Sequence, residues 1–201
     1  NSTVETIDVT SNQVTGSGTT QITINPSADF DSSTAYYVQI DATAFDDDAG
    51  NSYAGISDTT SLSFTSADVG VPTLSSSSPA FGATDITVDS NIVLNFSEAV
   101  DVETGTITLY KTSDNSVVES IAVDSGQVIG SGTTQIIINP SADFDSSTAY
   151  YVQIDATAFD DDAGNSYAGI SDTTSLSFTT ADVVAPSLSS SSPADNATAV
   201  A

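Results

Sequence analysis

The sequence predicts an all-β protein built from tandem two-sheet Greek-key sandwiches. Three observations support this fold class: residues 27–65 recur without a change as residues 141–179, short apolar segments alternate with a period of two residues, and no segment has the period of an amphipathic helix. Gly, Asn, Asp and Ser residues, which favour turns, separate the apolar segments. We expect seven to eight strands in each repeat, as a sandwich of about 100 residues requires.

The repeat has an offset of 114 residues, and this offset sets the expected domain boundaries. Residues 1–68 match residues 115–182, and residues 183–201 match residues 69–87. We therefore expect the C-terminal part of one repeat at 1–68, with its first strands missing. A complete repeat should follow at 69–182, and the first strand region of a third repeat at 183–201. An excerpt from a longer chain explains the incomplete ends, and completion of these ends by another chain is the alternative.

The composition is strongly acidic. The chain has 27 Asp and Glu residues against a single basic residue, Lys111, which gives a formal net charge of −26. Nucleic acids and anionic lipids bind through Lys and Arg, so neither is expected as a partner. No run of about 18 apolar residues is present, so we also expect no membrane insertion. Either a salt-adapted surface or a set of divalent cation sites would make this charge compatible with a compact fold.

The first strands of the complete repeat follow a linker that contains Pro72. We expect a short strand at residues 85–88 and a half-buried strand at residues 91–96, because the apolar side chains of the latter alternate. Residues 97–105 are interpreted as a loop rich in carboxylates, and residues 106–110 as the next strand.

Two further strands are predicted at residues 117–123 and 133–139. Within the second of them, Thr23 of the first copy stands where Ile137 stands in the second copy. This position should therefore face solvent, whereas the isoleucines on either side of it should face the core.

The longest strand is predicted at residues 148–159, with Tyr150, Val152 and Ile154 facing the core. A long loop at residues 160–174 should connect it to the last strand at residues 175–179.

The loop DDDAGN occurs twice, at residues 46–51 and 160–165, and puts three carboxylates and an amide oxygen within one turn. Ca²⁺ takes six to eight hard oxygen ligands, and the Gly allows backbone carbonyl groups to turn inwards. A solvated Asp/Gly/Asn turn is the alternative interpretation. Because almost no Lys or Arg is available to neutralise the loop, we favour a calcium site.

The expected topology brings several acidic segments to one joint between repeats. The loops at 97–105 and 160–174 should lie where the chain enters a sandwich, and the turn with Asp29 and Asp31 should lie where the preceding copy ends. Ca²⁺ held between these segments would stiffen the linker. The candidate calcium ligands are Asp29, Asp31, Asp46, Asp47, Asp48, Asn51, Asp68, Glu98, Asp101, Glu103, Asp160, Asp161, Asp162, Asn165 and Asp182.

Catalysis is not expected. Glu98 with Asp101 or Asp161 is formally an acid/base pair for glycoside hydrolysis. The chain has no His, Cys or Arg, however, so a nucleophile–base pair and an anion clamp are both excluded.

Three stretches together resemble a bacterial immunoglobulin-like domain, namely SPAFGATDITVDSNIVLNFSEAVD at 78–101, YYV at 150–152 and DAGN at 162–165. More narrowly, they resemble the extender repeats of very large calcium-dependent surface adhesins of Gram-negative bacteria, and the resemblance covers the complete repeat and both partial ones. It implies immunoglobulin-like sandwiches on the extracellular bacterial cell surface that bind Ca²⁺ at or near the joints with neighbouring repeats. Such repeats hold a distant adhesion domain away from the cell.

Two other functions remain open. The first is recognition of a surface glycan through Ca²⁺, for which Tyr167 beside Asn165 is the aromatic candidate. The second is self-assembly of the chain into a fibre or surface layer by exchange of strands. The aromatic residues expected to be exposed are Tyr37, Tyr53, Phe81, Tyr151 and Tyr167.

Overall fold

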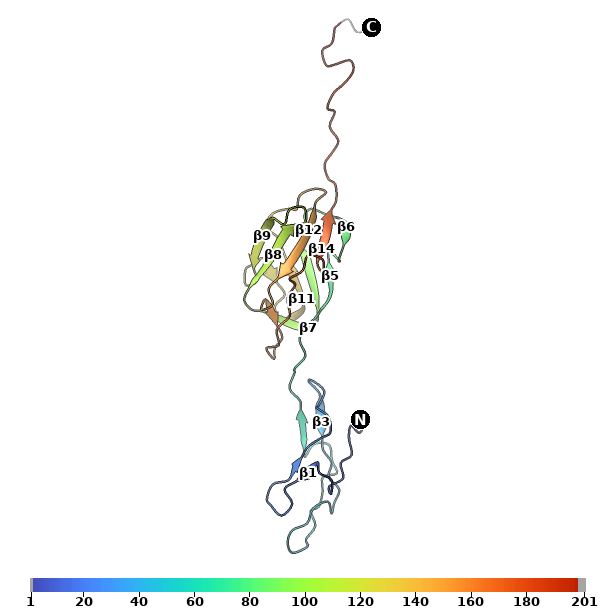
Figure 1. The fold of residues 1–201 in the computed structure, drawn as a ribbon, viewed down its shortest axis with the longest axis vertical. Helices are drawn as coiled ribbons and strands as arrows, with labels where there is room; N and C mark the ends of the chain where they lie inside the picture. The colour runs from blue at the N-terminus through green and yellow to red at the C-terminus, as the bar shows by residue number, and fades with distance from the viewer. Residues whose placement is uncertain (1, 199–201) are drawn as a thin grey trace. The chain divides into compact units, whose positions relative to one another are not determined.

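The computed structural model describes residues 2–198 and divides the chain into two compact units, unit 1 (Asn1–Gly70) and unit 2 (Val71–Ala201). All regular elements of the described residues are β-strands, so the predicted all-β class is confirmed (Figure 1). None of the described segments forms a helix with the length and hydropathy that a membrane span requires.

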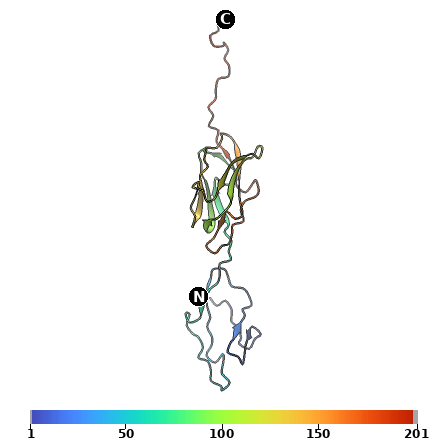
Figure 2. The ribbon, with the colours of Figure 1, turned by 90° about the vertical axis from the view of Figure 1, so that its left-hand side faces the viewer.

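Unit 2 is a sandwich of two sheets, which Figures 1 and 2 show from two directions. One sheet has the strand order β10-β11-β7-β13, with β5 also paired to β7, and the other has the order β6-β14-β12-β8-β9. Neighbouring strands are antiparallel, except that β6 runs parallel to β14. The strands are β5 (Leu74–Ser78), β6 (Ala83–Ile86), β7 (Ile92–Val102), β8 (Thr106–Lys111), β9 (Val117–Ala122), β10 (Val128–Ile129), β11 (Thr133–Ile138), β12 (Ala149–Ile154), β13 (Phe159–Asp160) and β14 (Ser177–Thr180).

The core of unit 2 lies between the sheets, because the apolar residues of each strand alternate. Ile136 and Ile138 of β11 are fully buried, whereas Ile137 between them is half-buried, which confirms the predicted alternation. Two groups of aromatic rings pack in this core. Phe144, Tyr150 and Phe178 form one, with ring centroids 4.9–5.7 Å apart, and Phe96, Phe159 and Tyr167 form the other.

The predicted loop at residues 97–105 is wrong, because β7 continues to Val102 and only three residues connect it to β8. Val100 is buried and pairs with Thr133 of β11, so the strand keeps its core face beyond residue 96. The next pair between these strands joins Asn95 to Gln135. Residues 96–99 of β7 therefore lie opposite the single residue Thr134 and form a special bulge, larger than the usual two residues against one.

The predicted long strand at residues 148–159 is also wrong, since β12 ends at Ile154. The Asp155 carboxylate accepts hydrogen bonds from the Thr106 N–H and hydroxyl groups, and the Asp155 carbonyl accepts one from the Ala158 N–H. This turn carries the chain to the other sheet, where β13 pairs with the end of β7. Local alternation gives no sign of such a change of sheet.

Smaller differences affect strand ends. The strand predicted at 85–88 is found as β6, two residues earlier, and the strand predicted at 175–179 is found as β14. Residues 183–198, predicted as the first strand region of a third repeat, form no strand, and residues 199–201 lie outside the described residues. In unit 2 the matching strand β5 is held by β7, and the described residues after 183 provide no counterpart of β7.

Unit 1 contains two sheets of two strands each. One joins β1 (Val14–Thr15) to β2 (Thr23–Ile24), and the other joins β3 (Ala35–Tyr37) to β4 (Ser63–Thr65). The register of β3 with β4 repeats that of β12 with β14, and the register of β1 with β2 repeats that of β10 with β11. Repeated sequence therefore gives repeated local pairing in the two units.

Candidate metal centre

The acidic loop of unit 2 is organised around Asp161, which follows β13. One oxygen of its carboxylate accepts hydrogen bonds from the N–H groups of Ala163 and Asn165, at 2.9 and 2.8 Å, and the other accepts one from the Asn165 amide at 2.9 Å. The hydrogen bond from the Asn165 side-chain amide is the main reason why the pKa of Asp161 lies below its usual value. The side chain is 6% exposed and therefore holds a negative charge in a covered position.

Glu98 lies close to this loop. It belongs to the irregular part of β7, and its carboxylate offers an oxygen within 4.8 Å of a carboxylate oxygen of Asp161. The neighbouring residue Ser97 exchanges two hydrogen bonds with Thr73, of 2.9 and 3.0 Å, at the point where the chain enters unit 2. The Glu98–Asp161 pair is thus fixed beside the entrance of the chain into the sandwich.

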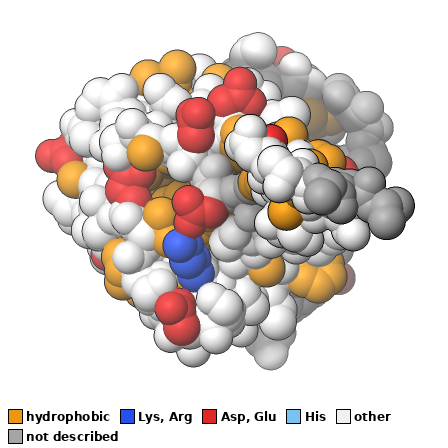
Figure 3. Space-filling model, turned by 90° about the horizontal axis from the view of Figure 1, so that it is seen from above, with side chains coloured by type: hydrophobic (Ala, Val, Ile, Leu, Met, Phe, Trp, Pro, Cys, Tyr) orange, Lys and Arg blue, Asp and Glu red, His pale blue; other side chains and the backbone are white. Residues whose placement is uncertain are grey.

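The basic residue of the chain lies against another carboxylate. The Lys111 amino group is 2.6 Å from the Asp145 carboxylate, and this contact raises the pKa of Lys111, mainly through the hydrogen bond. Figure 3 shows its side chain in blue against acidic side chains. Since Lys111 is the sole Lys or Arg, no second basic side chain exists to neutralise the Glu98–Asp161 pair.

Four other predicted ligands of unit 2 lie in neighbouring segments and do not join the pair. Asp101 and Asp160 are opposite each other in the β7–β13 pairing, and Asp101 accepts a hydrogen bond of 3.1 Å from the Ser131 hydroxyl group. Glu103 and Asp162 are exposed. Within residues 2–198, the group of carboxylates that contains Glu98 and Asp161 includes none of these four.

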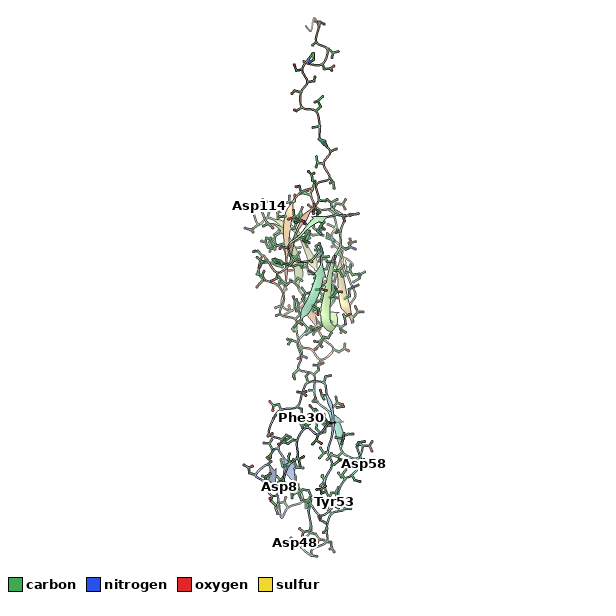
Figure 4. All side chains as sticks on the ribbon, turned by 90° about the vertical axis from the view of Figure 1, so that its right-hand side faces the viewer. Asp8, Phe30, Asp48, Tyr53, Asp58 and Asp114 are labelled. Carbon is green, nitrogen blue, oxygen red and sulfur yellow. The ribbon has the colours of Figure 1, made fainter. Side chains whose placement is uncertain are left out.

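The matching loop of unit 1 has the same internal geometry. The Asp47 carboxylate accepts hydrogen bonds from the Ala49 and Asn51 N–H groups and from the Asn51 amide, at 2.8–2.9 Å, which lower its pKa. Asp46 and Asp48 flank it and are exposed, and Figure 4 shows Asp48 and Phe30 at opposite ends of unit 1. The loop therefore takes this shape from its own hydrogen bonds, independently of a Glu98 counterpart.

The turn that contains Asp29 and Asp31 lies beside the exit of the chain from unit 1. The Ser32 hydroxyl group of this turn donates a 2.8 Å hydrogen bond to the Asp68 carboxylate and accepts one from the Val69 N–H. In unit 2, Ser146 makes the same contact with Asp182, at 3.2 Å. The predicted proximity of turn and exit is thus confirmed within each unit, although Asp29 and Asp31 are themselves exposed.

Two aromatic predictions are wrong. Tyr167 is 6% exposed and packs edge-on against Phe96, so burial raises its pKa and its ring is unavailable to a ligand. Tyr151 is 4% exposed, because its ring stacks on Tyr110 at a centroid distance of 4.7 Å and an interplanar angle of 7°. Both packing partners are distant in the sequence, and strand alternation therefore does not reveal them. Phe81 is exposed, as predicted.

A carboxylate that the prediction missed organises the segment before β14. Asp172 accepts hydrogen bonds from the N–H and hydroxyl groups of both Thr174 and Ser175, at 2.6–2.8 Å, and these bonds hold its pKa well below its usual value. The pattern D-T-T-S, repeated at residues 58–61, is a typical sequence signal for such a turn.

The family comparison agrees with this architecture. The sequence pattern of the family described as "Bacterial Ig-like domain" matches residues 1–66 and 68–180. No curated protein matches the chain. Among solved structures, "CopC from Methylosinus trichosporium OB3b" is similar with a TM-score of 0.41 and 13% identity, over 58% of this chain and 99% of that chain.

A second solved structure, "Biofilm associated protein - BSP domain", is similar with a TM-score of 0.27 and 18% identity, over 85% of this chain and 22% of that chain. The family match is the more extensive finding, because it covers most of the sequence in two consecutive segments. The family is one of non-catalytic domains. The two-sheet sandwich of unit 2 and this match lead to one conclusion: the chain belongs to the bacterial Ig-like domain family.

Proposed function

We propose that this chain is a non-catalytic, extracellular extender segment of a bacterial surface adhesin or fibre, in which Ca²⁺ stiffens the joints between repeats. The Glu98–Asp161 pair is the observation that carries the proposal. Two carboxylates within 4.8 Å of each other repel. Because the single basic residue of the chain is engaged at Asp145, a cation from solution is the counter-charge that would offset this repulsion.

The chemistry of the pair suits Ca²⁺. A carboxylate offers about four lone-pair positions, and three of those on Asp161 accept hydrogen bonds from its own loop. The Asp161 oxygens are therefore held in place, and they can still contribute to a set of six to eight oxygen ligands together with Glu98 and water. Mg²⁺ needs a near-ideal octahedron and releases water reluctantly, so Ca²⁺ is favoured over Mg²⁺.

Asp68 is the proposed ligand from the linker. Thr73 lies five positions after Asp68, so the extended chain between them spans at most about 18 Å. This tether is short enough for the Asp68 carboxylate to reach the entrance of unit 2. We propose that it completes the cation site and that Asp182 does the same for a following repeat, while Asp29 and Asp31 add charge at the same joint.

The test compares thermal unfolding of the full chain in chelator, in millimolar Ca²⁺, in Mg²⁺, and in NaCl of the same ionic strength. At a Ca²⁺ concentration 100 times the dissociation constant, we expect a stabilisation of about 2.7 kcal/mol. This corresponds to a rise of roughly 10 °C in the midpoint for a domain of this size. An equal rise in NaCl would mean that salt only screens the charge, and the calcium proposal would then be wrong.

A matched pair of variants locates the site. Glu98→Gln should remove most of the response to Ca²⁺, because it removes one of the two close carboxylates. Glu103→Gln should keep the response, since Glu103 is exposed and lies outside that group. Scattering measurements of the distance between the two halves of the chain, with and without Ca²⁺, test the stiffening itself. A calcium response without a narrower distance distribution would refute the stiffened joint.

A further inference from the structure

Unit 1 exposes an apolar face that is buried in unit 2. Ile22 is 37% exposed, whereas its counterpart Ile136 is 0% exposed, and Phe64 is 39% exposed against 2% for Phe178. The same contrast holds for other residues of the repeat, with exposures of 37–44% in unit 1 and 0–6% in unit 2. These residues are Ile24, Phe30, Tyr53 and Leu62.

In unit 2, this face is covered by β7 and β8. Strand β7 pairs with β11 over residues 92–100, and β8 pairs with all of residues 150–154 in β12. The inward side chains of these two covering strands, such as Leu94 and Leu109, are fully buried against the core. The cover therefore supplies backbone hydrogen bonds to both sheets and apolar side chains to the space between them.

Unit 1 has the acceptor edges without the covering strands. Within the described residues, β2 is paired to β1 and β3 is paired to β4, so each sheet stops at two strands. In unit 2, the strands that correspond to β2 and β3 continue to β7 and β8 on their other sides. A shallow, open hollow runs along the exposed face, lined by Ile22, Ile40, Phe45 and Tyr53 among others. Open strand edges beside an apolar hollow form a template for added strands.

We propose that unit 1 binds a polypeptide segment with the sequence character of residues 69–114, which adds a counterpart of β7 to β2 and a counterpart of β8 to β3. The added segment converts the two short sheets into a closed sandwich. Because β6 runs beside β14 in unit 2, the same segment would also place a strand beside β4.

The acceptor surface of unit 1 is nearly identical to a surface that binds this segment already. Residues 1–68 differ from residues 115–182 at eight positions, and none of the eight is an apolar residue of the core. Six of the matching positions in unit 2 are exposed, Ile137 is half-buried, and Thr180 keeps its hydroxyl group as Ser66. The positions that differ are 3, 6, 8, 10, 12, 15, 23 and 66.

Charge adds a second element of fit. In unit 2, the Lys111 amino group at the end of β8 lies 2.6 Å from Asp145. The counterpart of Asp145 in unit 1 is Asp31, which is exposed. The basic residue of an added segment would therefore meet a carboxylate at the matching place.

The first arm of the test supplies the segment in the same chain. An additional copy of residues 69–114 is placed before residue 1, and hydrogen exchange is measured in chelator, so that the result does not depend on Ca²⁺. The amide groups of Ile22, Ile24 and Phe64 should become as protected as those of Ile136, Ile138 and Phe178, within a factor of ten. The same extension with Leu94→Asp in the added copy should leave them unprotected. Unchanged exchange in the first extension would overturn the proposal.

The second arm supplies residues 69–114 as a separate polypeptide to the full chain of 201 residues. We expect a 1:1 complex by native mass spectrometry and a loss of fluorescence from a dye that binds exposed apolar surface. Ile22→Asp in the chain should abolish the complex, whereas Thr20→Asp, which adds the same charge at an exposed position, should not. Equal binding to both variants would contradict the proposal. Completion in the first arm without binding in the second would assign the segment to the same chain.

Discussion

Asp161 and Asp172 show how single carboxylates organise loops in this protein. Each accepts several hydrogen bonds from N–H, hydroxyl or amide groups within four residues of its own position. Such bonds favour the ionised form, so the pKa of each group is lower in the folded chain than in the unfolded chain. Both groups therefore contribute to stability above the usual Asp pKa of about 3.9, and they lose this contribution as the pH falls towards their folded pKa.

This linkage predicts a specific dependence on pH. Asp172→Asn should lower the stability of unit 2 at pH 7, and the difference between the wild type and the variant should shrink as the pH falls below about 4. The measurement is the urea midpoint of both proteins at pH 7, 5 and 3. Comparing the two proteins cancels the general loss of repulsion between carboxylates in acid, which both share. A difference that stays constant over this range would contradict the linkage.

At the scale of residues, the sequence revealed the chemistry of the candidate site better than its geometry. The DDDAGN loop predicted where carboxylates gather, but the pairing of Asp161 with Glu98 depends on an irregularity in β7. Alternation after Phe96 is broken by Ser97 and Glu98, and such a break predicts the end of a strand. A bulge and a loop give the same local pattern, and only pairing with β11 and β13 distinguishes them.

At the scale of elements, a glycine controls the hairpin from β10 to β11. Gly130 has a φ angle of +109°, and a side-chain Cβ atom at this position would lie 2.1 Å from the carbonyl oxygen of Gln135. The same close approach occurs at Gly16 in unit 1. This hairpin therefore requires glycine both for its backbone conformation and for space.

Gly130→Ala should destabilise unit 2 by about 2–4 kcal/mol, because the substitution combines backbone strain with a steric clash. Gly126→Ala is the matched control, in the preceding connection between β9 and β10. Its Cβ atom would lie in open space, and Asn12 occupies the matching position of the first copy. We expect an effect within about 0.5 kcal/mol for this variant. Urea unfolding of both proteins provides the comparison, and equal destabilisation by the two substitutions would contradict the role given to Gly130.

The strands themselves were largely predictable, because the side-chain period of two residues is a local property. Their ends were less predictable, since pairing sets them. β12 ends where Asp155 forms its turn, and β7 extends because β13 crosses over from the neighbouring sheet to pair with it. Both events join residues 49 to 59 positions apart in the sequence, beyond the reach of any local pattern.

At the scale of the whole molecule, the difference in burial between the units predicts how the chain unfolds. Unit 2 has a closed core, whereas unit 1 leaves the matching residues exposed. Folded domains unfold with about 0.7 kcal/mol of enthalpy per residue near 60 °C. We therefore expect one calorimetric transition of about 80 kcal/mol, which corresponds to the roughly 110 residues of the sandwich. An unfolding enthalpy of about 130 kcal/mol would mean that unit 1 unfolds cooperatively as well.

The 114-residue repeat explains why the fold class was predictable for the whole chain. Two copies of one sequence provide an internal comparison, as the exchange of Thr23 for Ile137 on an outward face illustrates. The same comparison shows that β7 and β8 cover the core in unit 2 and that residues 1–70 contain no counterpart of these strands. It does not reveal where carboxylates distant in the sequence come together, because that depends on the irregularity of β7.

The position of Lys111, the single basic residue, determines how the chain responds to proteolytic digestion. A protease of the trypsin type cuts after Lys or Arg, and this chain of 201 residues offers it one peptide bond, at the end of β8. A cut there would fall in the turn between β8 and β9, and each strand would keep its place in the sheet through β12 or through the pairing of β8 with β9. The nicked sandwich would consist of two fragments held together without a covalent bond. Such a chain could be severed in its backbone and still transmit tension until the fragments are pulled apart.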